Sequence, residues 1–229
     1  MFKGDPLYDE IKSELAPFIT GVIIADKTTR TYNQFRKNFR EWNQRFHKTL
    51  ELSETVESMQ QPQTYLMRQI SACEDSTDKA EKLTIVAVMN LFRYLALVES
   101  IGVSILDMLV LLLVANGHDF HVERAYDLPH IVHATDFRDL DNCTLADKIA
   151  YLKRNGLKKT SSFINRKLRN DIAHIDFHIS KEGKTSTKSY SRGVNTNQEI
   201  NMFNRVFMMI TLVLSDSGIY KVYSESQKN

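Results

Sequence analysis

Arg169, Asn170 and His174 lie close together near the end of a helical pattern, and their side chains could act on a phosphodiester. The ordinary imidazole pKa, about 6.5, lets histidine donate or accept a proton near neutral pH. Arginine offers a rigid fork of donors that fits phosphate oxygens. Cleavage of RNA by its own 2'-hydroxyl needs one proton removed from that hydroxyl, one given to the departing 5' oxygen, and positive charge beside the phosphate. These residue types would therefore suit RNA cleavage by the 2'-hydroxyl, a reaction that DNA should resist.

The spacing alone is not specific, because Arg followed by four to six residues and then His occurs three times in this chain. In Arg124–His130, Pro129 interrupts any helix that could join the two ends. Arg40–His47 shares a helical stripe with aromatic residues. Only in the third copy is the arginine, Arg169, followed directly by an asparagine, and only there does the motif end in Ala-His. This copy is therefore the candidate site.

On these residues the run Leu168–Phe177 resembles the HEPN superfamily, whose active members cut RNA without a metal. Most of the resemblance lies in Leu145–Phe177, about a seventh of the chain. It implies that His174 is a general acid or base, that Arg169 binds the phosphate and that Asn170 orients it. It also implies products with a 2',3'-cyclic phosphate and a 5'-hydroxyl, formed with no metal and no cofactor.

The resemblance leaves two classes of function open. In the first, the chain is a homodimeric endoribonuclease, such as a toxin or defence effector, with an antitoxin or a nucleotidyltransferase-like protein as its partner. In the second, it is a catalytically inactive HEPN-like module that binds a nucleotide, an RNA or a protein. The presence of Arg169, Asn170 and His174 together favours the first class.

A helical period explains how the candidate residues would be presented. At roughly 100° per residue, one apolar stripe faces a core, and a polar stripe faces away from it. The apolar stripe comprises Ile164, Leu168, Ile172 and Ile175, and the polar one comprises Arg166, Asn170, His174 and His178. A C2 dimer would place the polar stripe opposite its own copy, so that two sets of these side chains line one basic cleft.

The segment around the site is strongly basic. Residues 151–192 contain eleven Lys and Arg against three Asp and Glu, although the whole chain has a net charge of only +2. Such a cluster would attract a polyanion, but a solvated helix face has the same composition. Arg166, Lys167 and His178 are the candidates for substrate binding.

Most of the chain follows a helical pattern. The aromatic spacing in 31–59 indicates a seam that packs on another helix, and the alternation after Ile175 is compatible with a small β-hairpin. Helices are predicted over residues 6–19, 31–59, 63–72, 79–115, 145–155, the segment that carries Arg169, and 198–215.

The longest apolar stretch, 95–114, is long enough to span a bilayer. Glu99 and Asp107 lie within it, and a carboxylate near the bilayer centre costs about 2.5 to 3.5 kcal/mol. The sequence therefore predicts a buried central helix and no membrane association.

Two His-x2-His pairs occupy the connection that follows this helix, and such pairs can share a zinc ion. The four residues are His118, His121, His130 and His133. Pro129 separates the pairs and no cysteine pair accompanies them, so a polar connection is favoured over a metal site.

The expected architecture is an all-α, HEPN-like bundle with a long central helix. Residues 1–74 would form an N-terminal helical extension, residues 75–223 the HEPN-like domain, and residues 224–229 a disordered tail. Two cysteines are too few for a disulfide framework and the first ten residues do not resemble a signal peptide, so a cytoplasmic location is expected.

Overall fold

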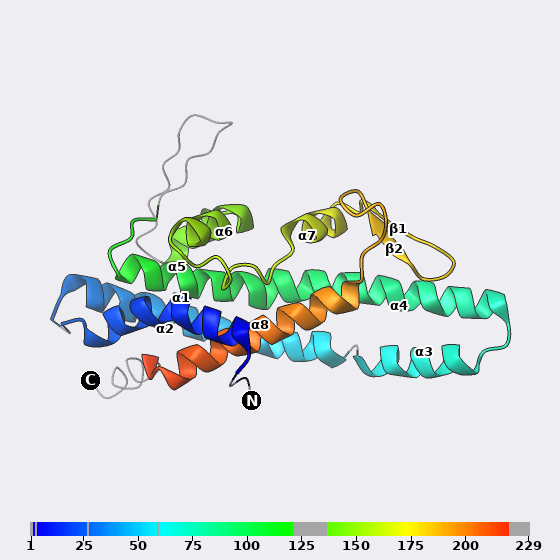
Figure 1. The fold of residues 1–229 in the computed structure, drawn as a ribbon, viewed down its shortest axis with the longest axis horizontal. Coiled ribbons are helices and arrows are strands. Elements are labelled where there is room, and N and C mark those ends of the chain that lie inside the picture. The colour runs from blue at the N-terminus through cyan, green and yellow to red at the C-terminus, as the bar shows by residue number, and fades with distance from the viewer. Residues whose placement is uncertain (1, 3, 27, 59, 121–136, 220–229) are drawn as a thin grey trace. The chain divides into compact units, whose positions relative to one another are not determined.

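The computed structural model describes residues 2, 4–26, 28–58, 60–120 and 137–219 (Figure 1). Within these residues the protein is mainly helical, which confirms the all-α prediction at that level, and two short strands form the predicted hairpin. The elements are α1 (Pro6–Ile24), α2 (Arg30–Ser58), α3 (Gln60–Ala72), α4 (Ser76–Leu97), the π-helical turn η1 (Val98–Gly102), α5 (Val103–Ala115), the 3-10 turn η2 (Phe137–Asn142), α6 (Leu145–Arg154), α7 (Arg166–Ala173), β1 (Phe177–Ile179), β2 (Thr185–Thr187) and α8 (Thr196–Asp216).

The chain divides into two compact units, each assembled from separate segments. Unit 1 comprises residues 1–47, 103–163 and 205–229, and unit 2 comprises residues 48–102 and 164–204. The boundary that the sequence predicts after residue 74 falls inside unit 2. The division into an N-terminal extension and a HEPN-like domain stays a prediction.

Unit 1 contains the aromatic seam of α2. Phe35, Phe39, Trp42 and Phe46 are buried, and the Trp42 indole N–H donates to the backbone oxygen of Ser104 over 2.7 Å. Burying a large ring is favourable, and the indole N–H finds the partner that burial requires. The seam therefore packs in a core, as the spacing predicts.

The first turns of the helices show why they begin where they do. The Asp5 carboxylate accepts a hydrogen bond from the Leu7 N–H, and Asp75 likewise caps α4. Thr144 and Asp147 form a reciprocal capping box at the start of α6. These ends lie at or within a few residues of the positions that the sequence predicts.

Residues 76–115 form a nearly continuous helical segment interrupted by one π-helical turn. Its most apolar window has a mean hydropathy of 2.3 and would suffice in length and composition to cross a membrane. However, 78% of that window is buried inside the protein, which is consistent with the core helix of a soluble protein. The two carboxylates within residues 95–114 each have a cationic partner in their own unit: Asp107 pairs with Lys148, and Glu99 pairs with Arg169.

The histidine-rich connection is described only in part. His121, His130 and His133 lie outside the described residues, as does the predicted tail 224–229. The imidazole Nδ1 of His118 lies 2.9 Å from the side-chain oxygen of Asn155 in unit 1. Within the described part of the chain, no three His, Cys, Asp or Glu side chains are grouped as a metal site would require.

Candidate functional site

The helix that carries the candidate residues, α7, is short and belongs to unit 2, where it packs on α4 (Figure 1). Asn165 caps it through a side-chain bond from the Leu168 N–H, and the Asn165 N–H donates to the Tyr94 hydroxyl over 2.8 Å. The Tyr190 hydroxyl donates to the same Asn165 side-chain oxygen. An isolated helix of eight residues would be marginal in water, so these contacts and the buried Leu168 and Ile172 hold it in place.

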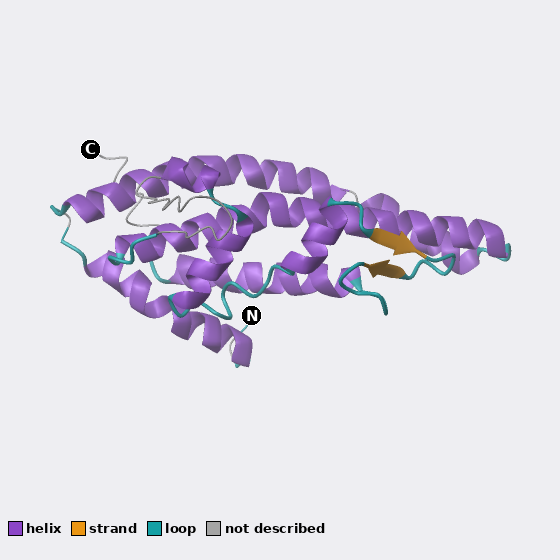
Figure 2. Cartoon of the chain, turned by 90° about the horizontal axis from the view of Figure 1, so that it is seen from above, coloured by secondary structure: helices purple, strands orange, loops and turns teal. Residues whose placement is uncertain are grey.

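A buried carboxylate connects α7 to the hairpin that follows it. One oxygen of Asp171 accepts hydrogen bonds from the Thr187 hydroxyl, over 2.6 Å, and from the Ser189 N–H, over 2.8 Å. Burial opposes ionisation of Asp171, but these hydrogen bonds outweigh it and hold the pKa of the carboxyl below its ordinary value. Figure 2 shows β1 and β2 as the antiparallel pair whose register places His178 opposite Ser186. Asp171 is therefore a structural anchor within the candidate motif.

The helix ends earlier than the apolar stripe predicts. Its last residue is Ala173, and His174 is the C-cap. The N–H of Ile175 donates to the oxygen of Ile172, and the N–H of Asp176 donates to the oxygen of Asp171, which is the hydrogen-bond pattern of a Schellman C-cap. Ile175 consequently has φ of 60° and is 75% exposed. The prediction that Ile175 faces the core is wrong, because the chain turns at this residue.

Replacing Ile175 with glycine is expected to stabilise the protein by about 1 kcal/mol. A β-branched residue in the left-handed region is strained by roughly 1 to 2 kcal/mol, which glycine relieves, and the exposed side chain gives up little burial. Urea unfolding of Ile175→Gly measures the change. Ile175→Ala keeps a Cβ and serves as the control. Equal stability of the two variants would contradict the strain argument.

The polar stripe also differs from the prediction. Arg166 and Asn170 lie on α7, and His174 caps it, so these three keep their helical spacing. His178 instead lies on β1, because the left-handed turn at Ile175 separates it from the helix. Arg166, Lys167 and His178 are all exposed. The structure therefore leaves His178 outside the helical stripe.

Arg169 is held from two directions. Its Nε donates to the Glu99 carboxylate in a short ionic contact, and its Nη1 donates to the Asn170 side-chain oxygen over 3.0 Å. On an ideal helix Asn170 and His174 are four residues apart and lie on one side, whereas Arg169 lies about 140° from His174. The bond to Asn170 links the guanidinium to a residue that, on an ideal helix, lies on the same side as His174.

Glu99, which contacts Arg169, was not among the site residues predicted from the sequence. It lies in the π-helical turn η1 of unit 2, and such turns are frequent at functional sites. The available signal was a carboxylate inside an apolar stretch, since a charge there must find a partner. Glu99 is 42% exposed and Arg169 is 27% exposed at the side chain, so the pair remains accessible from solvent.

His174 is exposed at the end of α7. Its backbone N–H donates to the Asn170 oxygen, which fixes the main chain, while no hydrogen bond or ion pair within the described residues occupies the imidazole. A ring with both nitrogens open can accept or donate a proton to a ligand.

The basic cluster is divided between the two units. Seven of its eleven basic residues and all three acidic ones belong to unit 2, with the candidate motif. In unit 1, Lys159 pairs with Glu10 over 3.0 Å, and the Glu14 carboxylate accepts the N–H groups of Lys159 and Thr160. The charge around the motif is therefore less basic than the contiguous sequence suggests.

Comparison of the chain with family models, with curated proteins and with solved structures finds no match. The assignment of a function to the site therefore depends on its geometry alone. That geometry comprises an accessible imidazole and a guanidinium oriented by a carboxylate and an amide, all within unit 2.

Proposed function

We propose that this protein is a metal-independent endoribonuclease of HEPN type, active as a cytoplasmic homodimer and serving as a toxin or defence effector. The observations that carry the proposal are the Arg169 guanidinium, which Glu99 and Asn170 hold, and the exposed His174 at the end of the same helix, whose imidazole has no hydrogen bond or ion pair within the described residues. A guanidinium for phosphate and an imidazole for proton transfer are the two groups that the reaction needs.

In the proposed reaction, an imidazole of His174 removes the proton from the 2'-hydroxyl, and the resulting oxygen attacks the adjacent phosphorus. The bond from phosphorus to the 5' oxygen breaks, and the leaving oxygen takes a proton from the His174 of a second copy. Arg169 stabilises the charge on the non-bridging oxygens. The products are a 2',3'-cyclic phosphate and a 5'-hydroxyl, so protons and electrons balance without a metal.

In this mechanism Glu99 is a positioning residue. It contacts the Nε of Arg169 and leaves other guanidinium N–H groups available to a phosphate. Two copies of the site are proposed because one imidazole cannot remove and supply protons on opposite sides of a phosphorus at the same moment. Specific activity should accordingly rise with protein concentration across the range in which the dimer forms.

The second candidate function is a catalytically inactive HEPN-like module that binds RNA, a nucleotide or a protein partner, including an antitoxin or a nucleotidyltransferase-like protein. The pairing of Arg169 with Glu99 favours this alternative in one respect, since the carboxylate neutralises part of the charge that a phosphate would meet.

Labelled RNA incubated with the purified protein in EDTA is expected to be cleaved, and the matching DNA is expected to remain intact. Arg169→Ala should lower kcat/KM by about 10² to 10³-fold, because removing one preformed donor to a developing charge has an effect of that size. Arg169→Lys keeps the charge but not the fork or the bond to Glu99, and should recover only part of the loss. Equal cleavage by all three proteins would indicate a contaminating nuclease and would reject the proposal.

A further inference from the structure

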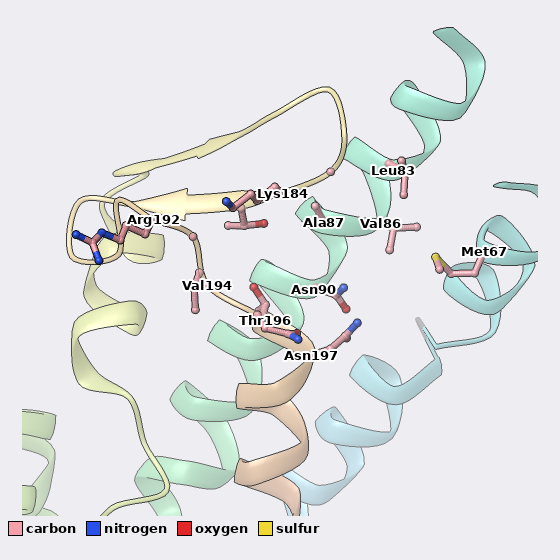
Figure 3. Close-up of a pocket in the computed structure, with 14 residues that line it drawn as sticks. Met67, Leu83, Val86, Ala87, Asn90, Lys184, Arg192, Val194, Thr196 and Asn197 are labelled. Atoms are coloured by element: carbon pink, nitrogen blue, oxygen red, sulfur yellow. The ribbon is translucent and has the colours of Figure 1, made fainter. Parts of the chain in front are cut away.

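The helix α4 has sides that other elements of unit 2 cover and one side that they leave exposed. It packs on α3, α7 and β1. It also lines a pocket of about 470 Å³ with the hairpin and the start of α8, where Asn90, Lys184 and Thr196 are among the lining residues (Figure 3). Residues of α4 on these sides are buried, among them Val86 and Leu91. The exposed residues of α4 therefore mark the side that these elements do not cover.

That side is apolar, and it is called here the open face of α4. Ile85 is 42% exposed and Phe92 is 51% exposed. They are seven residues apart, so both lie on one side of the helix. Partly exposed apolar residues continue the stripe: Val88, Met89, Leu95 and Ala96. Spacings of three and four residues are those with which one helix packs on another. The open face therefore has the pattern of a helix-helix seam, although no described element buries Ile85 or Phe92.

A buried arginine borders the open face. Arg93 is 9% exposed, and its Nε is buried with no hydrogen-bond partner. Within the described residues, no hydrogen bond or ion pair involves its guanidinium. Arg93 follows Met89 by four residues and precedes Ala96 by three, so it is the neighbour of both on the helix surface. A buried charge without a counter-charge destabilises a fold, so this guanidinium indicates an anionic group that the described residues do not supply.

The charges along α4 decide which kind of partner fits this face. Arg93 is the only charged residue between positions 83 and 98. A C2 contact through this stretch presents the same surface from both sides, so a second copy would add another unpaired Arg93 and no carboxylate. The carboxylates beyond its ends, Glu81 and Glu99, lie about 120° around an ideal helix from Arg93, on the other edge of the apolar stripe. A different polypeptide, with carboxylates beside an apolar helix face, supplies the charge that is missing.

We propose that the open face of α4 binds an acidic amphipathic helix of a partner protein. The apolar side chains of that helix cover Ile85 and Phe92, and one of its Asp or Glu residues pairs with Arg93. Seven residues beyond Phe92, the face reaches Glu99, which contacts Arg169. The bound helix therefore lies beside the candidate site and should inhibit RNA cleavage. This inhibition rests on the proposed ribonuclease function, whereas binding of the helix does not.

Fluorescence anisotropy with two labelled peptides and the whole protein tests the proposal. Both peptides have leucine at the a and d positions of about three heptads, and they carry either glutamate or lysine at the e and g positions. The glutamate peptide should bind about tenfold more tightly than the lysine peptide, because only glutamate accepts a charge-assisted hydrogen bond from the guanidinium. Equal affinities, or no binding of either peptide, would overturn the proposal.

Two variants of the face and two matched controls locate the binding. Arg93→Met should remove the preference for the glutamate peptide, and Phe92→Ala should weaken binding about tenfold because it truncates a central apolar anchor. Arg68 is an exposed arginine on α3, and Met202 is 43% exposed on α8, both in unit 2. Arg68→Met and Met202→Ala should leave both affinities unchanged. A control variant with the same effect as its partner on the face would contradict the assignment.

Urea unfolding of the free protein is a second, independent measurement. Because Arg93 is buried without a partner, Arg93→Met should raise the unfolding midpoint, whereas loss of a paired arginine would lower it. A lower midpoint would therefore reject the proposal. A dimer that Phe92→Ala converts to a monomer in ultracentrifugation, with neither peptide bound, would assign the face to a second copy and reject it as well. Binding of the glutamate peptide by a protein that cuts no RNA would reject only the ribonuclease function.

Discussion

His174→Ala is expected to slow RNA cleavage in EDTA by about 10² to 10⁴-fold. Proton transfer by a positioned side chain contributes that much to such reactions, and alanine can neither accept nor donate a proton. Because His174 is exposed and its side chain has no partner within the described residues, the substitution should leave the unfolding midpoint unchanged. Single-turnover rates at saturating protein, with the cyclic phosphate product identified directly, provide the measurement.

The chain contains its own control for this experiment. His47 is exposed on α2 and completes the other described Arg and His pair at the same class of spacing, with Arg40. His47→Ala should retain full activity. Loss of activity in His47→Ala, or its retention in His174→Ala, would show that the catalytic group lies elsewhere. The identity of the 3' end decides the chemistry separately, because a metal-dependent hydrolysis would not leave a cyclic phosphate.

Lys148→Met is expected to destabilise unit 1 by about 3 to 5 kcal/mol at pH 8. The Lys148 ammonium lies 2.5 Å from the Asp107 carboxylate, and both side chains are about 5% exposed. Removing one member of a buried pair leaves an uncompensated charge, whereas the methionine retains most of the apolar volume. Urea unfolding monitored by the fluorescence of Trp42, which is buried in the same unit, measures the loss.

The loss of stability caused by Lys148→Met should be smaller at pH 5 than at pH 8. Burial raises the pKa of Asp107 to about 6 even though Lys148 opposes the shift. A folded-state pKa above the unfolded one favours folding at low pH, and this contribution is lost as the pH rises through the folded value. Without Lys148 the pKa of Asp107 should rise further. In the Lys148→Met variant the Asp107 carboxyl is therefore neutral at pH 5. At pH 8 it is ionised, and its unpaired charge lowers the stability of unit 1.

Two variants check this interpretation. Lys148→Met combined with Asp107→Leu removes both charges, and should recover most of the lost stability and abolish the pH dependence. Lys159→Met disrupts an ion pair with Glu10 whose side chains are about half exposed, and should change stability little. A single Lys148→Met variant as stable as the unmodified protein at pH 8 would show that the pair is hydrated rather than buried.

The helices were predictable because their signals are local. The caps at Asp5 and Thr144 and the aromatic period of α2 depend on residues within a few turns of one another, and the structure has them where the sequence predicts. The end of α7 was not predictable, because Ile175 adopts a backbone conformation that its side chain disfavours. Periodicity cannot detect a turn that is imposed on an isoleucine by surrounding contacts.

The candidate site was predictable in its residues but not in its partners. Short-range spacing singled out Arg169, Asn170 and His174, yet it could not show that Glu99, seventy residues earlier, contacts Arg169. The sequence also shows as one basic segment a set of Lys and Arg residues that the structure divides between two units. Distances between such residues depend on how helices pack and not on their separation in the chain.

The amino-acid order by itself determined that this protein is mainly helical, where most helices begin, and which short segment carries an imidazole beside a guanidinium. Those properties follow from hydrogen bonds and side-chain periods within a few turns. The tertiary structure alone decided that Glu99 and Asp107 each pair with a cationic side chain, that α7 ends before Ile175, and that Asn90 and Thr196 share a pocket with Lys184. Those properties arise because burial forces polar groups distant in the chain to find one another.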